Sequence, residues 1–176
     1  MKRKFSEELL DIDVIVYNLD ISLGQSILDA GCGNGYMAKR FSELAGDTGK
    51  IYALDPDKES IATLREEVKK TNIETLIGDI TQTTVLKNHS IDLVYLSTVF
   101  HIFSDTQIEG FIKELKRILK PKAKLAVVNI KKEDTPFGPP VEMRSSPEEL
   151  KQKIPLVPGK VFDVGRHFYM QLFENK

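Results

Sequence analysis

The sequence predicts an α/β fold, a three-layer α-β-α sandwich around a mostly parallel, doubly wound sheet with an antiparallel last strand. Three observations predict it. Short apolar runs alternate with amphipathic stretches along the chain, which is typical of β-α-β units. Aspartates close or follow the first three apolar runs, at Asp29, Asp55 and Asp79. The first of these runs leads into a glycine-rich turn and then a helix.

Composition limits the class of protein. The chain has 176 residues and a mass of 19.9 kDa, which predicts a single domain over residues 1–176. Its 25 basic and 26 acidic side chains nearly cancel, so nucleic acid is not the expected partner. The single cysteine excludes an internal disulfide and a cysteine-rich zinc site, and we expect no metal. No apolar run approaches the ~20 residues of a membrane span, so the expected location is the cytoplasm.

The first half of the chain predicts a helix over 6–19, with Ser6 as its N-cap, and then two β-α units. Their predicted elements are a strand over 27–29, a helix over 36–45 closed by Gly46, a strand over 50–54, and a helix over 58–70 capped by Asp57.

The second half predicts three more strands, over 74–77, 91–96 and 125–130. A capping box at Ser104 opens a helix that is expected to stop at Pro121, and a second capping box at Ser146 opens a short helix. Residues 131–145 are predicted as a loop, and 160–164 with 167–173 as a β-hairpin.

Five β-then-α units followed by an antiparallel pair imply a sheet covered by helices on both faces. Right-handed crossovers then place the carboxyl ends of the parallel strands along one edge of the sheet. Ligands of such sheets bind at that edge. The aspartates that follow the first three strands are therefore expected to lie at one site.

The turn from Asp29 to Gly35 is the first candidate site. Glycines at Gly31, Gly33 and Gly35 allow a sharp turn and a close approach of the backbone to a ligand. The helix that follows presents free N–H groups, which suit a carboxylate or a phosphate. Taken alone, this pattern supports only a tight strand-to-helix turn.

The later aspartates sharpen the prediction. Asp55 lies 20 residues beyond Gly35, at the end of the next strand, where a ribose diol would be reached in a dinucleotide or an adenosyl site. Asp79 repeats the pattern on the third strand, where its carboxylate can accept a bond from an adenine amino group. Together the three acids favour a nucleoside ligand.

A nicotinamide dinucleotide is the nearest rival ligand. Its Gly-x-Gly-x-x-Gly fingerprint, counted from Gly31, requires glycine at position 36, where this chain has Tyr36. An acid at Asp29 would also repel a pyrophosphate. The same acid favours a ligand that carries an ammonium group.

Segments of this sequence resemble, in order, the motifs of class I S-adenosylmethionine-dependent methyltransferases. The similar segments are 27–35 (ILDAGCGNG), 51–55 (IYALD), 78–80 (GDI), 91–97 (IDLVYLS) and 115–121 (LKRILKP). The resemblance covers roughly residues 20–130 and implies a Rossmann-like methyltransferase fold. Within the family, the chain is most similar to the small-molecule branch that includes quinone-biosynthesis methyltransferases.

The resemblance implies that the first motif holds the methionine end of S-adenosylmethionine. Asp29 would orient the methionine amino group, directly or through water. The backbone at Gly31 and Gly33 would pass beneath the methionine, in the turn that ends at Gly35. The backbone near Ser97, in the fourth motif, would line the same end of the cofactor.

The other motifs would hold the adenosine. The resemblance implies that Asp55 binds the two ribose hydroxyls and that Pro56 lies against the adenine. Asp79 would bind the adenine amino group, and the N–H of Ile80 would bind a ring nitrogen.

The implied activity is methyl transfer to a small-molecule acceptor by direct in-line displacement. His101, just past the fourth strand, is the candidate general base, although the same position can merely close the cofactor pocket. Two other readings remain open, a non-catalytic S-adenosylmethionine-binding partner subunit and an RNA or protein methyltransferase. We expect an open site unless a second subunit, as in a homodimer, or the acceptor itself covers it.

Overall fold

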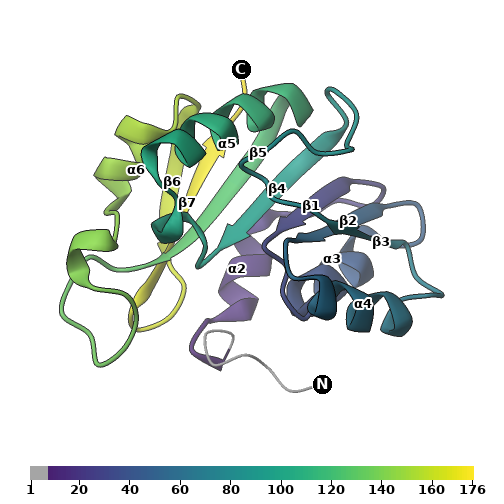
Figure 1. The fold of residues 1–176 in the computed structure, drawn as a ribbon, viewed down its shortest axis with the longest axis horizontal. Coiled ribbons are helices and arrows are strands. Elements are labelled where there is room, and N and C mark those ends of the chain that lie inside the picture. Colours follow the sequence, from purple (N-terminus) through teal and green to yellow (C-terminus); the bar gives the residue numbers. More distant parts are fainter. Residues whose placement is uncertain (1–7) are drawn as a thin grey trace.

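The structure is a computed structural model that describes residues 8–176. Over these residues, seven strands form one sheet in the order β3-β2-β1-β4-β5-β7-β6 (Figure 1). The strands β1 to β5 run parallel to one another, and β7 is antiparallel to both β5 and β6. The predicted fold class, with its antiparallel closing strand, is confirmed.

The strands are β1 (Ser26–Ala30), β2 (Lys50–Asp55), β3 (Ile73–Ile77), β4 (Ile91–Ser97), β5 (Leu119–Ile130), β6 (Val157–Asp163) and β7 (Phe168–Glu174). The helices are α2 (Ile12–Leu19), α3 (Tyr36–Ala45), α4 (Lys58–Glu67), α5 (Asp105–Ile118) and α6 (Pro147–Lys153), with short 3-10 turns η1 (Phe100–Ile102) and η2 (Val141–Met143). None of the helices within residues 8–176 is both long and apolar enough to cross a membrane.

The helices form two layers, α2, α3 and α4 on one face of the sheet and α5 and α6 on the other (Figure 1). The sheet separates two hydrophobic cores. In the central strand β1, Ile27 belongs to the core on the first face and the adjacent Leu28 to the core on the second. Both side chains are fully buried. A strand buried on both faces reads as a continuous apolar run, as the sequence has it.

Both predicted capping boxes are confirmed. At the start of α5, the Gln107 N–H donates to the Ser104 hydroxyl at 3.3 Å, and the Ser104 N–H donates to the Gln107 side chain at 3.0 Å. At the start of α6, Ser146 and Glu149 exchange the same two bonds at 3.2 and 2.8 Å. Each box satisfies N–H groups that the first turn of a helix leaves free.

The helix predicted over 6–19 is wrong at residues 9–11, which are not helical. Its proposed cap, Ser6, lies outside the described residues, and the helix α2 begins only at Ile12. Asp11 is the cap, since its carboxylate accepts from the Val14 N–H at 3.1 Å while its own N–H donates to Val164 at 2.8 Å. That tie to the far end of the chain keeps Leu9 and Leu10 out of α2.

The prediction of five β-then-α units is also wrong by one, because residues 78–90 between β3 and β4 form no helix. Several boundaries differ as well. Helix α4 ends at Glu67 rather than at residue 70, β6 begins at Val157 rather than at 160, and β5 begins at Leu119 rather than at 125. Pro121 therefore lies inside a strand, where pairing of Leu119 with Ile91 draws the chain into the sheet directly after α5.

Candidate functional site

The glycine-rich turn after β1 has a conformation that glycine alone adopts without strain. Gly31, Gly33 and Gly35 have φ angles of 74°, 53° and 72°. A Cβ atom on Gly31 would lie 2.6 Å from the Val99 side chain, and one on Gly35 would lie 2.5 Å from Leu64 of α4. The turn thus needs glycine both for its backbone angles and for its close packing against the loop after β4 and against α4.

Hydrogen bonds join this turn to the end of β2. The N–H groups of Gly31 and Cys32 donate to the Leu54 carbonyl at 2.8 and 3.0 Å. The Gly33 N–H donates to one carboxylate oxygen of Asp55 at 2.8 Å, and the Asp57 N–H donates to the other, also at 2.8 Å. Asp55 is therefore held by the turn itself, which brings the first two acidic motifs into one rigid unit.

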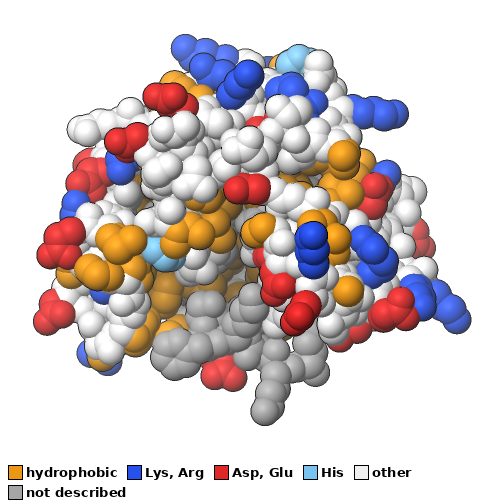
Figure 2. Space-filling model, in the orientation of Figure 1, with side chains coloured by type: hydrophobic (Ala, Val, Ile, Leu, Met, Phe, Trp, Pro, Cys, Tyr) orange, Lys and Arg blue, Asp and Glu red, His pale blue; other side chains and the backbone are white. Residues whose placement is uncertain are grey.

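A cavity of about 300 Å³ lies at this edge of the sheet. Figure 2 shows a hollow on the same face of the molecule, with hydrophobic side chains inside it and a histidine at its rim. Asp29 lines the cavity although only 3% of its surface is exposed. The buried Asp29 carboxylate thus presents a negative charge to a ligand in this cavity.

The structure brings most, but not all, of the predicted cofactor residues to this cavity. Five of them line it: Asp29, Gly31, Asp55, Pro56 and Ser97. Gly33 and Gly35 act on its shape, through the bond to Asp55 and through the start of α3. Asp79 and Ile80 do not line it. The Asp79 carboxylate accepts from the Thr81 N–H at 2.8 Å, and Ile80 is buried in the core beneath.

Further lining residues escaped the sequence analysis. They are Leu10, Cys32, Met37, Tyr95, Thr98, Val99 and Ile102. Thr98 is the most informative, because its φ of 57° is a left-handed conformation that a β-branched residue rarely adopts. Its N–H donates to Val128 at 2.8 Å, which fixes it against β5. No local sequence pattern predicts this conformation, since a threonine disfavours left-handed backbone angles.

His101 lies in η1 and lines a second, smaller cavity of about 150 Å³. Thr98 lines both this cavity and the larger one, so the two adjoin there. Burial lowers the pKa of His101 below its usual 6.5, and the nearby positive charge of Arg144 lowers it further. The imidazole is therefore neutral near pH 7 and able to accept a proton.

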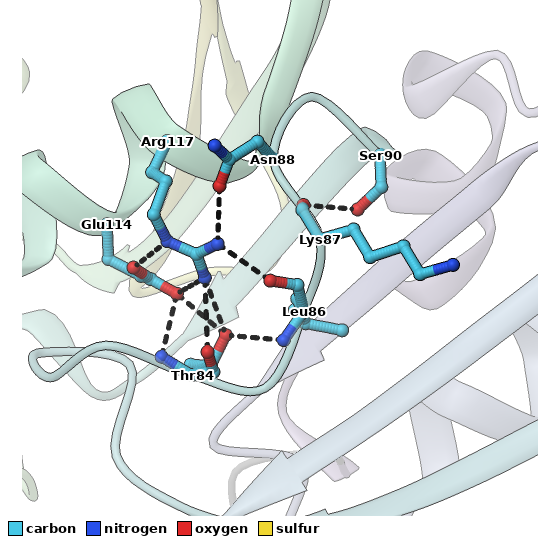
Figure 3. Close-up of polar contacts among 7 residues, drawn as sticks. All are labelled: Thr84, Leu86, Lys87, Asn88, Ser90, Glu114 and Arg117. Carbon is cyan, nitrogen blue, oxygen red and sulfur yellow. Dashed lines mark hydrogen bonds and ion pairs between the residues drawn. The ribbon is translucent and has the colours of Figure 1, made fainter.

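A buried ion pair organises the irregular segment 78–90 that follows β3 (Figure 3). Arg117 of α5 donates to both carboxylate oxygens of Glu114, at 2.8 and 2.6 Å. It also donates to the Leu86 carbonyl at 2.7 Å and the Asn88 side chain at 2.8 Å. Glu114 accepts from the Thr84 N–H at 2.9 Å and from its hydroxyl at 2.6 Å. Side chains of α5 therefore hold the segment 78–90 in place, in a crossover that contains no helix of its own.

The pKa of the Glu114 carboxyl depends on Arg117. Burial by itself raises the pKa of the Glu114 carboxyl, but the hydrogen bonds from Arg117 and Thr84 outweigh it and hold the pKa below its usual 4.5. A lowered carboxyl pKa stabilises the fold above pH 4.5, and this stabilisation is lost as the pH falls through the folded-state value. Glu114 is only 2% exposed, so its charge needs a partner.

Replacement of Arg117 by methionine is expected to lower the free energy of unfolding by about 3–5 kcal/mol at pH 7, because it leaves a buried carboxylate uncompensated. The loss should shrink toward pH 4, where Glu114 in the variant takes up a proton and becomes neutral. Urea unfolding at the two pH values measures both effects. Lys116→Met, at the exposed neighbouring position, is the control. A loss of stability equal in both variants would contradict this account.

Comparison with known proteins places this edge-of-sheet site in a family. A family model described as "Methyltransferase domain" matches residues 27–122, more than half of the chain, including the glycine turn and β1 to β4. The chain belongs to this methyltransferase domain family. The family predicted from the sequence is confirmed.

Solved structures agree with this methyltransferase domain. A SAM-dependent methyltransferase from Aquifex aeolicus superposes with a TM-score of 0.86 and is 29% identical, covering 96% of this chain and 92% of that one. A putative type 11 methyltransferase from Sulfolobus solfataricus shares the fold, with a TM-score of 0.78 at 24% identity over 96% and 94% of the two chains.

Among curated relatives, an uncharacterized methyltransferase of Schizosaccharomyces pombe is 32% identical over 113 residues, which are 64% of this chain and 42% of the relative. The ubiquinone/menaquinone biosynthesis C-methyltransferase of Escherichia fergusonii is 25% identical over 115 residues, 62% of this chain and 44% of the relative. The chain thus spans less than half the length of the curated relatives it matches.

The cofactor of this methyltransferase domain is S-adenosylmethionine, as the family and its SAM-dependent neighbour indicate. The site fits that cofactor. A buried acid at Asp29 suits its ammonium group, and the carboxylate of Asp55 is held at the rim by backbone N–H groups. A volume of about 300 Å³ falls at the lower end of the usual range for small-molecule sites, roughly 300–1,000 Å³.

Proposed function

We propose that this chain transfers a methyl group from S-adenosylmethionine to a small-molecule acceptor. The observation that carries the proposal is the meeting of two cavities at Thr98, one walled by the acidic and glycine motifs and the other almost entirely apolar. A cofactor cavity with a separate small pocket beside it provides room for two reactants side by side. Holding two reactants in register can supply on the order of 7–11 kcal/mol of the barrier.

The chain's own residues have distinct binding roles in this proposal. Asp29 holds the ammonium group, and Asp55 accepts from the two ribose hydroxyls while Pro56 lies against the adenine. We keep Asp79 and the Ile80 N–H as the proposed partners of the adenine edge, although neither residue lines the cavity of about 300 Å³. The cofactor, when bound, supplies a methyl group already activated on a sulfonium. The protein then has to orient the acceptor in line and keep water out.

His101 is the candidate general base in the acceptor cavity. Its neutral imidazole can take a proton from an acceptor that must lose one. Acceptors that carry a free electron pair without a proton to lose would need no such base. We therefore assign His101 a role that depends on the acceptor atom.

The relatives do not name the acceptor. Their printed names include a protein-L-isoaspartate O-methyltransferase and a ubiquinone/menaquinone C-methyltransferase, whose acceptors differ widely. The near-neutral charge of the chain disfavours bulk RNA, which needs a basic surface. The small apolar cavity favours a small molecule over an extended peptide.

Calorimetry with S-adenosylmethionine, with NAD as the comparison ligand, tests the cofactor seat. Micromolar binding of S-adenosylmethionine and no binding of NAD are expected, because Asp29 favours an ammonium group and repels a pyrophosphate. Absence of S-adenosylmethionine binding at millimolar concentration would overturn the proposal.

Methyl transfer is tested with methyl-labelled S-adenosylmethionine and a cell extract separated into small molecules, RNA and protein. The label is expected in the small-molecule fraction. Label in the RNA or protein fraction would show that the acceptor is a macromolecule and would overturn the proposal of a small-molecule acceptor. Cofactor binding without any labelled product would support the reading as a non-catalytic partner subunit.

A further inference from the structure

We infer that the smaller cavity is an acceptor subsite for one uncharged, apolar group of about the size of a single six-membered ring. We call it the ring cavity and define it by Leu9, Thr98, His101, Ile130, Phe137 and Phe168. The inference rests on the proposed function, since it names the class of acceptor that the methyl transfer would use. It comes from the volume, the chemistry and the rigidity of the walls.

The volume limits the size of the occupant. The ring cavity measures about 150 Å³. A dry apolar cavity of about that volume in another protein binds a single benzene molecule. A monocyclic ring or a branched alkyl group of similar volume fits between these walls, whereas a fused bicyclic ring would extend beyond them into the open side of the cavity.

The walls favour an uncharged occupant. Phe137 and Phe168 lie nearly parallel, with ring centroids 6.2 Å apart and an interplanar angle of 21°. Ile130 and Leu9 supply aliphatic surface. Among the described residues that line the ring cavity, polar side chains occur at Thr98 and at His101, whose pKa is lowered by burial. Transfer of a charge into such surroundings costs several kcal/mol.

The wall formed by the segment after β5 is fixed before any ligand arrives. Arg144 is only 5% exposed, and its guanidinium donates to four backbone carbonyls of that segment. The accepting carbonyls, with their distances, are those of Pro139 (2.8 Å), Glu133 (2.7 Å), Lys131 (3.1 Å) and Phe137 (3.3 Å). This arginine therefore folds the segment around its own charge and holds Phe137 in place.

A second contact keeps the same segment close to the sheet. Gly138 has a φ of 98°, and a Cβ atom there would lie 2.6 Å from the end of the Ile130 side chain. The segment therefore passes close over β5 in a backbone conformation that favours glycine. A preformed pocket binds without the entropy cost of ordering a loop.

The position of Thr98 sets the orientation of the acceptor. Thr98 lines the cofactor cavity as well, so the part of the acceptor beside it faces the methyl donor. The apolar ring then lies between Phe137 and Leu9, and the atom that receives the methyl group lies at the Thr98 end. The acceptor class is a small monocyclic or similarly compact apolar molecule with its nucleophilic atom at one end.

Fluorine NMR with 4-fluorophenol, with and without saturating S-adenosylhomocysteine, tests the ring cavity. A dissociation constant in the millimolar range is expected for the wild-type chain, as for a fragment of this size. Leu9→Trp should weaken the probe at least tenfold by filling the cavity. Leu23→Trp, the same substitution at a site 78% exposed before β1, should leave the affinity unchanged.

The opposite change uses the same readout. Phe137→Ala removes one wall, so 6-fluoro-2-naphthol should gain affinity relative to 4-fluorophenol by at least fivefold. The anion 4-fluorobenzoate should bind the wild-type chain at least tenfold more weakly than the phenol. An unchanged probe affinity in Leu9→Trp, or benzoate binding as tight as the phenol, would overturn the ring cavity as assigned.

The cofactor measurement separates this inference from the proposed function. Leu9 and Phe137 do not line the cofactor cavity, so calorimetry should give the same S-adenosylmethionine affinity in all the variants within about twofold. Normal cofactor binding without probe binding would reject the ring cavity alone. Probe binding without cofactor binding would reject the proposed function and leave an apolar site.

Discussion

Asp55→Ala is expected to weaken S-adenosylmethionine binding at least a hundredfold. A carboxylate that accepts from both ribose hydroxyls makes two charge-assisted bonds, each worth about 1.5–3 kcal/mol, and about 1.4 kcal/mol corresponds to a tenfold change in affinity. The substitution also removes the acceptor for the Gly33 and Asp57 N–H groups, which would loosen the turn. Calorimetry measures the affinity directly.

Two further variants keep this prediction interpretable. Asp47→Ala makes the same substitution at an exposed turn before the other end of β2, and it should leave the affinity unchanged. Asp55→Asn keeps the shape and loses the charge, so its affinity should fall between those of wild type and alanine. Circular dichroism establishes that each variant is folded. Equal affinity in wild type and Asp55→Ala would refute the role given to this acid.

Asp29→Asn is expected to weaken the binding of S-adenosylmethionine by about 10–100-fold and to leave the binding of 5′-methylthioadenosine unaffected. The first ligand carries a sulfonium and an amino acid moiety with its ammonium group, whereas the second has the same nucleoside with a neutral thioether and no amino acid moiety. A buried carboxylate beside a cation contributes strongly, since solvent screens it little at 3% exposure. The ratio of the two affinities therefore separates the contacts of the cationic amino acid end from those of the nucleoside.

The two variants should affect the two ligands differently. Asp55→Ala should weaken the binding of both ligands, because both contain the ribose. Asp29→Asn should weaken the binding only of the ligand with the amino acid moiety. If Asp29→Asn weakens both ligands equally, the acid supports the turn rather than the ammonium group. Because Asp29 is buried, unfolding measurements on Asp29→Asn are needed to show that the fold persists.

Features with a local cause were predictable from the sequence. The turn from Gly31 to Gly35 needs positive φ angles, and glycine announces them. The caps at Ser104 and Ser146 bond to N–H groups within their own first turn, so a four-residue pattern suffices to recognise each one. The antiparallel hairpin and the placement of Asp29 and Asp55 followed from strand and turn patterns together with the right-handed crossover rule.

The residues of the acceptor side could not be predicted from the sequence, because contacts with distant parts of the chain place them. Leu9 looked like part of an amphipathic helix, but a bond from Asp11 to Val164, at the far end of the chain, keeps it outside α2, and it lines the ring cavity. Thr98 adopts a left-handed conformation that its side chain disfavours, and pairing with Val128 holds it there. Arg144 lies in the segment predicted only as a loop, and its guanidinium donates to four backbone carbonyls of that segment.

The sequence by itself determined the fold class, the family and the cofactor, because each depends on contacts between residues near in the chain or on strand ends that the topology must align. The tertiary structure alone decided where the second cavity lies, how large it is, and that the segment 78–90 is ordered by Glu114 and Arg117. Cavities and buried ion pairs depend on the packing of segments distant in sequence, and no local propensity encodes that packing.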